Sequence, residues 1–218
     1  MSTGVSGISI LVDRFLDDLR DRLDAGSQGI AIQSEIGELR ALWPEHAGDS
    51  VSVEPVRLPV CDYLAPALDQ ARAGCESRLA LSIAALAPAL RWTYSYPTNP
   101  RDRDLSSKVG FAQIAGQRGL QNDARIHIGL TLIAPHVVYP AHRHPAVELY
   151  LVVSGIALWQ SGNAEPALLP PGSIILHPSE VVHAMTTFDQ PLLAIWTWRG
   201  NLASPSVYVN LRAEAPPA

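Results

Sequence analysis

From Trp92 onward the pattern of apolar and turn-forming residues changes, and this change limits the folds that the chain can adopt. Short runs of β-branched, leucine and aromatic residues alternate there with glycine, proline and asparagine, as is typical of an antiparallel barrel or sandwich. The runs predict strands over residues 126–133, 147–153, 156–160, 173–176 and 192–198. Ser154-Gly155 lies between two of them and predicts a tight turn. We therefore expect a mostly β structure over residues 91–213.

The first 90 residues have the periodicity of helices instead. Apolar residues recur at three- and four-residue steps between Ile8 and Leu23, which places them on one helix face, and Gly26 ends that segment. Further helices are predicted over residues 30–43, within 62–74 and within 76–87, whereas residues 51–60 predict a connector or an edge strand. We expect an α-helical extension over 1–90 that packs on the barrel or builds a homodimer interface. Residues 214–218 are rich in alanine and proline and predict a frayed tail.

The charge balance excludes several classes of partner. The net charge is −5, so no basic field exists to hold nucleic acid or an anionic membrane. No apolar stretch reaches the roughly 18 residues that a membrane span needs, and residues 7–12 are too short for a signal-peptide core. Reduced thiols are favoured over a disulfide for the two cysteines, Cys61 and Cys75. We expect a cytoplasmic protein whose partner is a small molecule.

A cluster of candidate metal ligands lies within the β-rich part. His142 and His144 are two residues apart, so both imidazoles point to the same side of an extended strand, and Glu148 keeps that parity. A further ligand must come from elsewhere in the sheet, and His183 is placed to provide it. Imidazole and carboxylate ligands without a thiolate suit Fe, Zn, Mn, Ni or Co. The sequence therefore predicts one divalent metal ion bound by these four residues, with His142 either a permanent ligand or a pocket residue.

The other histidines have no such neighbours. His136 and His177 are expected in loops or at the rim of the barrel, and His127 could line its interior. His46 lies in the helical part, far from the candidate ligands in sequence.

The ligand residues also resemble the two sequence motifs of the cupin superfamily. The matching residues are His142, His144, Glu148 and Gly155 in the first motif and Gly172, Pro178 and His183 in the second. Glu180 stands where the second motif has a glycine, Thr187 stands where it has an asparagine, and the glycine before the first histidine is absent. These departures concern turns and leave the ligands intact. The resemblance implies a single cupin barrel, which is a double-stranded β-helix.

The segments around the motifs resemble the cupin-type dimethylsulfoniopropionate (DMSP) lyases of the DddQ and DddL kind. The similar segments are residues 130–135, 139–150, 183–185 and 191–200, within a resemblance that covers residues 92–200. It implies a carbon–sulfur lyase that converts DMSP to dimethyl sulfide and acrylate by β-elimination. A divalent ion on the substrate carboxylate would make the neighbouring Cα–H more acidic, so no organic cofactor is needed.

The resemblance implies roles for aromatic residues as well. Tyr150 is the first candidate for the base because it follows Glu148 at the same parity, and a neighbouring cation would lower a tyrosine pKa. Tyr139 is the second candidate and a candidate substrate-binding residue. Trp196 and Trp198 share one strand face and could hold the sulfonium group by cation–π attraction. Core packing is the alternative for each of them, as for the alternating residues Trp92, Tyr94 and Tyr96.

Two other kinds of function remain open from the residues. A different cupin enzyme, either a dioxygenase or an isomerase, could use the same ligands, because the fold alone names no reaction. A sugar-phosphate isomerase would need basic residues facing the phosphate, whereas Arg143 alternates away from the ligands. A non-catalytic small-molecule-binding cupin is the second alternative, although the acidic N-terminal helices offer no basic helix pair for DNA.

Overall fold

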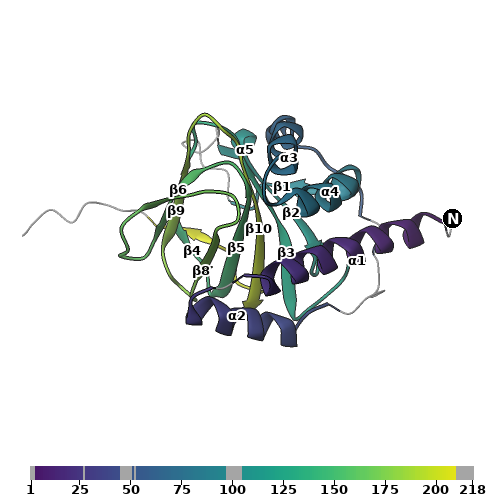
Figure 1. Ribbon diagram of the computed structural model, residues 1–218, viewed down its shortest axis with the longest axis horizontal. Helices are drawn as coiled ribbons and strands as arrows, with labels where there is room; N and C mark the ends of the chain where they lie inside the picture. Colours follow the sequence, from purple (N-terminus) through teal and green to yellow (C-terminus); the bar gives the residue numbers. More distant parts are fainter. Residues whose placement is uncertain (1–2, 27, 45–50, 52, 97–104, 210–218) are drawn as a thin grey trace, which may run out of the picture.

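The computed structural model describes residues 3–26, 28–44, 51, 53–96 and 105–209. Two antiparallel sheets face each other, and the N-terminal helices lie on one side of them (Figure 1). This arrangement confirms the mostly β barrel with an α-helical N-terminal part. His46 and the tail over 214–218 lie outside the described residues.

The N-terminal part contains the helices that the apolar periodicity predicts. They are α1 (Thr3–Asp24), α2 (Ile30–Ala41), η1 (Pro59–Tyr63), α3 (Leu64–Arg72), α4 (Ser77–Leu86) and η2 (Ala87–Ala89). On α1 the predicted face is buried at Phe15, Leu16 and Leu19, whereas Ile10 is exposed. A further short helix, α5 (Leu105–Lys108), was not among the predicted elements. Between α2 and η1 the described residues form one bridge, from Val56 to Arg91, so this segment is a connector.

The barrel consists of a six-stranded and a five-stranded sheet. The first contains, in spatial order, β1 (Trp92–Thr93), β2 (Val109–Ala115), β3 (Ile126–Ile133), β10 (Leu192–Gly200), β5 (Ala146–Ser154) and β8 (Ile174–His177). The second contains β11 (Val207–Tyr208), β4 (Val138–Arg143), β9 (His183–Thr187), β6 (Ala157–Ser161) and β7 (Ala167–Leu169). All pairs within the two sheets are antiparallel.

The helices that the structure describes lie against the six-stranded sheet. Helix α3 contacts β5 and β10, and α2 contacts β8, with the five-stranded sheet on the opposite side of the molecule (Figure 1). Strand β3 is buried at every position because helices lie on one of its faces and the barrel interior lies on the other. The outer face of the five-stranded sheet is exposed, as Val138 and Leu168 show.

Two arginines tie the helices to the barrel. Arg199 on β10 forms two hydrogen bonds of 2.6 Å with the buried carboxylate of Glu35 on α2. Arg22 on α1 donates to Glu76 at 2.7 Å and to the carbonyl of Gly172 at 3.0 Å. Bidentate and charge-assisted bonds of this kind fix orientation as well as contact. The helices are therefore held in one position against the sheet that carries half of the candidate site.

Two turns show why the motif positions matter. Gly155 has a φ of +81°, and a Cβ there would lie 2.1 Å from the carbonyl oxygen of Pro191, so the turn requires glycine. Glu180, where cupins have glycine, has a φ of +65°. The turn thus keeps the left-handed conformation without the glycine, at a cost of about 1 kcal/mol. The Glu180 backbone N–H donates to the carbonyl of His144 at 2.9 Å, which links the two motifs.

Thr187 takes the place of the motif asparagine with a buried side chain. Its hydroxyl donates to the carbonyl of Ala134 at 2.6 Å and accepts from the backbone N–H of Val137 at 3.0 Å. These bonds hold the turn that leads into β4, so threonine fixes the entry to the strand that carries His142.

No helix among the described residues is both long enough and apolar enough to cross a bilayer. Cys61 is a buried free thiol and Cys75 an exposed one.

Candidate active site

Four residues on neighbouring strands of the six-stranded sheet form a row that faces the interior. Trp198 on β10 pairs with His127 on β3 and with Glu148 on β5, and Glu148 pairs with His177 on β8. Residues directly opposite each other in a sheet share a face. His127, Glu148 and His177 are all buried, so this first row carries three ionisable side chains and an indole into the barrel.

A second row faces the first from the five-stranded sheet. His142 on β4 pairs with His183 on β9, and His183 pairs with Ser161 on β6. The rings of His142 and His183 have centroids 4.1 Å apart. Ser161 Oγ lies 3.0 Å from Nδ1 of His177, so the two rows are in contact at this end.

The carboxylate of Glu148 is the centre of the cluster. Its Oε2 lies 3.0 Å from Nε2 of His144, which follows β4 in the turn to β5, and 3.2 Å from Nε2 of His183. These three residues are buried, and their ligand atoms all lie within 4.8 Å of one another. His142 lies beside this group and is not part of it, although its ring contacts His183. The group of His144, Glu148 and His183 could hold a metal ion.

Backbone carbonyls orient the three histidine rings in the same way. Nδ1 of His142 lies 2.8 Å from the carbonyl of Pro140, that of His144 lies 3.0 Å from Ala146, and that of His183 lies 2.9 Å from Val181. Each Nδ1 therefore carries the hydrogen and donates it to a carbonyl. A neutral ring then has its lone pair on Nε2, which is the arrangement that a metal-binding histidine requires. In His144, Nε2 also carries a hydrogen, because it donates to the Glu148 carboxylate, and this hydrogen would have to leave before the ring binds a metal. Nε2 of His183 is buried 3.2 Å from Oε2 of Glu148, but the two atoms are not aligned for a hydrogen bond.

The electrostatics of the cluster keep Glu148 ionised. Burial alone would raise the pKa of Glu148, but the hydrogen bond from His144 and the neighbouring His183 outweigh it and hold the pKa well below the usual range. Burial, with the nearby His183, lowers the pKa of His142 to about 3, so this ring is neutral at neutral pH. Burial would lower the pKa of His144, but the hydrogen bond to Glu148 outweighs burial and raises it, so a metal ion would take the place of the His144 proton beside the carboxylate.

Trp198 holds the other oxygen of the same carboxylate. Its indole Nε1–H donates to Oε1 of Glu148 at 2.6 Å, and its ring lies on that of His144 with centroids 4.3 Å apart. Trp196 projects to the same face of β10, and a Cβ on Gly129 would lie 2.5 Å from its ring. The absence of a side chain at Gly129 therefore makes room for Trp196.

The two candidate tyrosines have different surroundings. Tyr150 on β5 is buried, and its hydroxyl lies 3.5 Å from that of Thr131. Burial, followed by the negative charge of Glu148, raises the pKa of Tyr150 well above the ordinary value. Tyr139 on β4 is buried as well, and its hydroxyl lies 2.5 Å from that of Tyr96. Burial and the neighbouring Tyr96 raise the pKa of Tyr139 too.

Tyr139 belongs to a group of tyrosines that sequence reasoning did not assemble. Tyr96 stacks on Tyr208 with ring centroids 4.2 Å apart, and the hydroxyls of Tyr94 and Tyr208 lie 2.8 Å apart. The group joins the segment after β1 to strands β4 and β11. The alternation of Tyr94 and Tyr96 was the only signal for it in the sequence.

The prediction that His177 lies in a loop or at the rim is wrong. His177 is the last residue of β8, is fully buried, and stacks on His183 with centroids 4.0 Å apart and an interplanar angle of 11°. Pairing with Glu148 directs it inward, because residues opposite each other share a face. His136 is exposed, as predicted for a loop residue. His127 lines the interior, as the sequence allowed.

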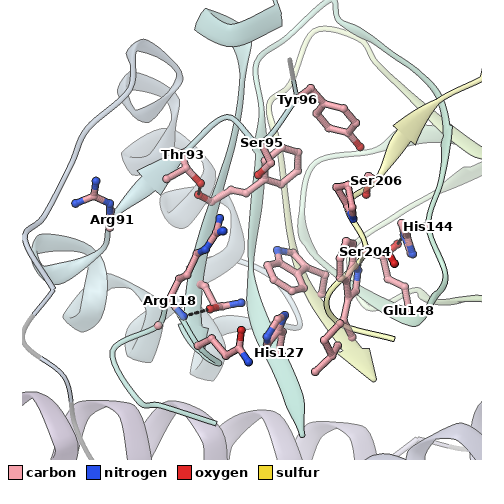
Figure 2. A pocket seen from close by; sticks show the side chains of 18 of the residues that line it. Arg91, Thr93, Ser95, Tyr96, Arg118, His127, His144, Glu148, Ser204 and Ser206 are labelled. Carbon is pink, nitrogen blue, oxygen red and sulfur yellow. Dashed lines mark hydrogen bonds and ion pairs between the residues drawn. The ribbon is translucent and has the colours of Figure 1, made fainter. Parts of the chain in front are cut away.

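A cavity of about 900 Å³ contains nearly all of the predicted site residues. Its lining includes His142, His144, Glu148, Tyr139, Tyr150, Trp196 and Trp198. His183 is buried and is not part of the lining. His144 and Glu148 lie on one side of the cavity, Arg118 lies on the other, and His127 lies between them (Figure 2). The cavity is large enough for a small molecule with space left over.

An antiparallel two-sheet barrel with a buried histidine–carboxylate group between the sheets defines a mostly β cupin. The model of the dimethylsulfoniopropionate lyase family matches residues 39–194, and the chain belongs to this family of carbon–sulfur lyases. A protein of Cereibacter sphaeroides with the provisional name dimethylsulfoniopropionate lyase DddL is 32% identical over 84% of this chain and 77% of its own length. Dimethylsulfoniopropionate lyase DddQ of Ruegeria pomeroyi is 29% identical over 81% and 93% of the two chains.

The solved structures agree with this assignment. A chain from the crystal structures of the DMSP lyases RdDddP and RnDddQII superimposes with a TM-score of 0.71 at 30% identity. The superposition covers 92% of this chain and 98% of the other, so it includes the helical part as well as the barrel.

Proposed function

We propose that this protein cleaves DMSP to dimethyl sulfide and acrylate in a metal-dependent β-elimination. The observation that carries the proposal is the group of His144, Glu148 and His183, of which His144 and Glu148 line the same cavity as Tyr150. Membership of the DMSP lyase family supports the substrate. The reaction needs a Lewis acid, a base and a surface that tolerates a cation, and the cavity offers a candidate for each.

The donor set fits a first-row divalent ion. The proposed ligands are His144, Glu148 and His183, with His142 as the fourth ligand or as a pocket residue beside them. Nε2 of His144 and Nε2 of His183 lie 3.0 and 3.2 Å from Oε2 of Glu148, and the Nδ1 contacts with backbone carbonyls orient all three rings; both observations support this set. Fe, Zn, Mn, Ni and Co all suit imidazole and carboxylate ligands. When bound, such an ion would draw negative charge from a substrate carboxylate and so acidify the adjacent Cα–H.

Tyr150 is the proposed base. Tyr150 follows Glu148 by two residues on β5, so both side chains project from the same face of this strand. As the phenolate, it takes the proton from Cα through Oη, the C–H electrons form the new double bond, and the Cβ–S bond breaks with its electrons on sulfur. The leaving group is neutral dimethyl sulfide. Because burial and Glu148 raise the Tyr150 pKa, the phenolate needs a nearby cation. Tyr139 is the second candidate.

Aromatic faces are the proposed contacts for the sulfonium group. Trp196, Trp198 and Tyr139 line the cavity and offer faces that attract a cation without a hydrogen bond. Trp198 has a second function in this proposal, since its bond to Oε1 fixes the Glu148 carboxylate. A loss of activity in a Trp198 variant would therefore combine two effects, whereas a Trp196 variant would report on the pocket alone.

The direct test is release of dimethyl sulfide from DMSP by the full chain, measured by gas chromatography of the headspace. We expect turnover with a divalent ion present, loss after treatment with a strong chelator, and recovery when the ion is added back. Anaerobic turnover that still yields acrylate excludes a dioxygenase. Turnover that is unaffected by chelation, with no metal in the protein, would contradict the metal dependence, and no release under any metal would contradict the substrate.

The stack of His177 on His183 leads to a prediction about metal affinity. His177→Phe keeps a ring against His183 but loses the contact with Ser161, so His183 is held less firmly. We expect metal to bind about tenfold more weakly, as for other residues that orient a ligand, in a competition assay with a metal-binding dye. Ser161→Ala should have a similar effect, and His136→Phe, at an exposed histidine, should have none. If His177→Phe and Ser161→Ala both leave the metal affinity unchanged, the stack of His177 on His183 contributes to packing and not to metal binding.

A further inference from the structure

The cavity continues beyond the proposed lyase site. From Glu148 the first row crosses β10 at Trp198 and reaches His127 on β3, which is two strand spacings away, or roughly 10 Å. Past His127 the wall is formed by the segment that follows β2, including Arg118 (Figure 2). DMSP is much smaller than the cavity of about 900 Å³, so this outer end is not filled when the inner end is occupied.

His127 has an unused hydrogen-bonding atom in this outer end. The side chain is 9% exposed, it lines the cavity, and its Nε2 is buried with no partner among the described residues. A buried polar atom without a partner costs about 1–3 kcal/mol, so such atoms are rare unless something binds to them. Burial, and then the charge of Arg118, lowers the pKa of His127, so the ring is neutral and can donate one N–H.

Gln113 presents a second donor beside this ring. Its side-chain Oε1 accepts a hydrogen bond of 2.6 Å from the backbone N–H of Arg118, so the oxygen is occupied and the NH₂ group points elsewhere. Gly116 has a φ of +133°, and a Cβ there would lie 2.6 Å from His127 Cδ2 and 2.8 Å from Gln113 Nε2. Gly116 therefore lets the amide and the imidazole approach the same point on the backbone.

Arg118 supplies the charge. Its exposed guanidinium has no ion-pair partner within the described ranges, and its field reaches His127. The carboxylate that raises the pKa of His127 is that of Asp123, which is bound to Arg125 through both of its oxygens. The other charged residues of the outer end are Arg91 and Glu54 near the rim. Three donors, one of them cationic, thus face the outer end, while the carboxylates that line the cavity in the described part of the chain are Glu54 near the rim and Glu148 at the inner end.

We infer that His127, Gln113 and Arg118 form an outer subsite that binds the carboxylate group of a small organic acid. A guanidinium with two neutral donors matches the two oxygens of a carboxylate. The subsite is separate from the Glu148 cluster and does not depend on the lyase reaction. The carboxylate can come from an incoming DMSP molecule or from acrylate. Acrylate is favoured, because Arg118 repels the sulfonium group of DMSP.

The test measures acrylate binding to the full chain after metal removal, by ligand-observed NMR on the vinyl protons at constant low ionic strength. Removal of the metal leaves the inner end without its ion, so the binding that persists reports on the outer subsite. Arg118→Gln should weaken this binding about tenfold, as expected for one charge-assisted hydrogen bond. Arg91→Gln removes the same charge from the rim of the same cavity and should change it by less than about threefold.

The other arms separate the possible outcomes. Gln113→Leu should weaken acrylate binding without a change of charge, and DMSP should bind the wild-type subsite more weakly than acrylate. An absence of acrylate binding in the metal-free protein, an equal loss in both arginine variants, or tighter binding of DMSP would overturn the proposal. Acrylate binding without any release of dimethyl sulfide would refute the lyase proposal and leave the subsite standing. Release of dimethyl sulfide without acrylate binding to the metal-free protein would refute the subsite and leave the lyase proposal standing.

Discussion

Glu148→Gln is expected to abolish metal binding and DMSP cleavage together. The amide keeps the shape of the carboxylate but removes the charge that lies 3.0 Å from His144 and 3.2 Å from His183. We expect metal affinity to fall by more than the roughly 100-fold that is the upper range for residues outside the ligand set. Dimethyl sulfide release should fall below detection at stoichiometric metal. Metal content by atomic emission and headspace chromatography measure the two effects on the same sample.

Glu54→Gln is the matched control for this variant. Glu54 is an exposed carboxylate of the same cavity, so the same chemical change is made outside the cluster. It should leave metal content and turnover within about twofold of the wild type, as is usual for an exposed charge. A Glu148→Gln protein with full metal content would remove Glu148 from the ligand set and leave the histidines alone as ligands.

Tyr150→Phe is expected to separate metal binding from catalysis. The variant loses the hydroxyl that would take the Cα proton, and general-base catalysis contributes about 10²–10⁴ in rate. We therefore expect a loss of that size in turnover with unchanged metal content. Because the Tyr150 pKa is raised without a cation, metal addition to the wild type should produce the ultraviolet difference spectrum of tyrosinate. The variant should lack that signal.

Tyr139→Phe is the comparison that assigns the base. It removes a buried hydroxyl from the same cavity, and leaves the Tyr96 hydroxyl without its 2.5 Å partner, so some stability should be lost. If Tyr150 is the base, Tyr139→Phe should keep most of the turnover at saturating DMSP and should lose affinity for it. A large loss of turnover in Tyr139→Phe with a small one in Tyr150→Phe would reverse the two roles.

The parity of the sequence predicted part of the site. His142 and Glu148 were placed on one side of extended chain, and the structure has both in the same cavity. His183 was joined to them by motif spacing, and its ring contacts that of His142. His142, His144 and Glu148 do not share one extended strand, however, because β4 ends at Arg143 and β5 begins at Ala146. His144 lies in the turn between these strands, so the fold of the barrel, and not parity alone, brings the ligands together. Parity does not fix the rotamer, so the bond from Trp198 to Glu148 was not predictable.

The position of His177 was not predicted from the sequence. The predicted strand ended at residue 176, and one further residue of pairing turns His177 toward Glu148. Element ends are set by partners that are distant in the sequence, and the residue before a proline gives little local signal. Strands β2, β4 and β9 were not predicted for a related reason. They are short or contain glycine, alanine and histidine, so their pairing stabilises them more than their own composition does.

The two facing rows have a consequence for folding. Each side chain of the proposed ligand set comes from a different strand or turn, and each reaches the interior only in one register. A slip of one residue in β5 would turn Glu148 toward the helices and bring an apolar neighbour inward. A chain with any of these strands out of register therefore has an incomplete set of ligands. Under the proposed function, the metal ion would bind and stabilise only barrels whose strands are correctly paired.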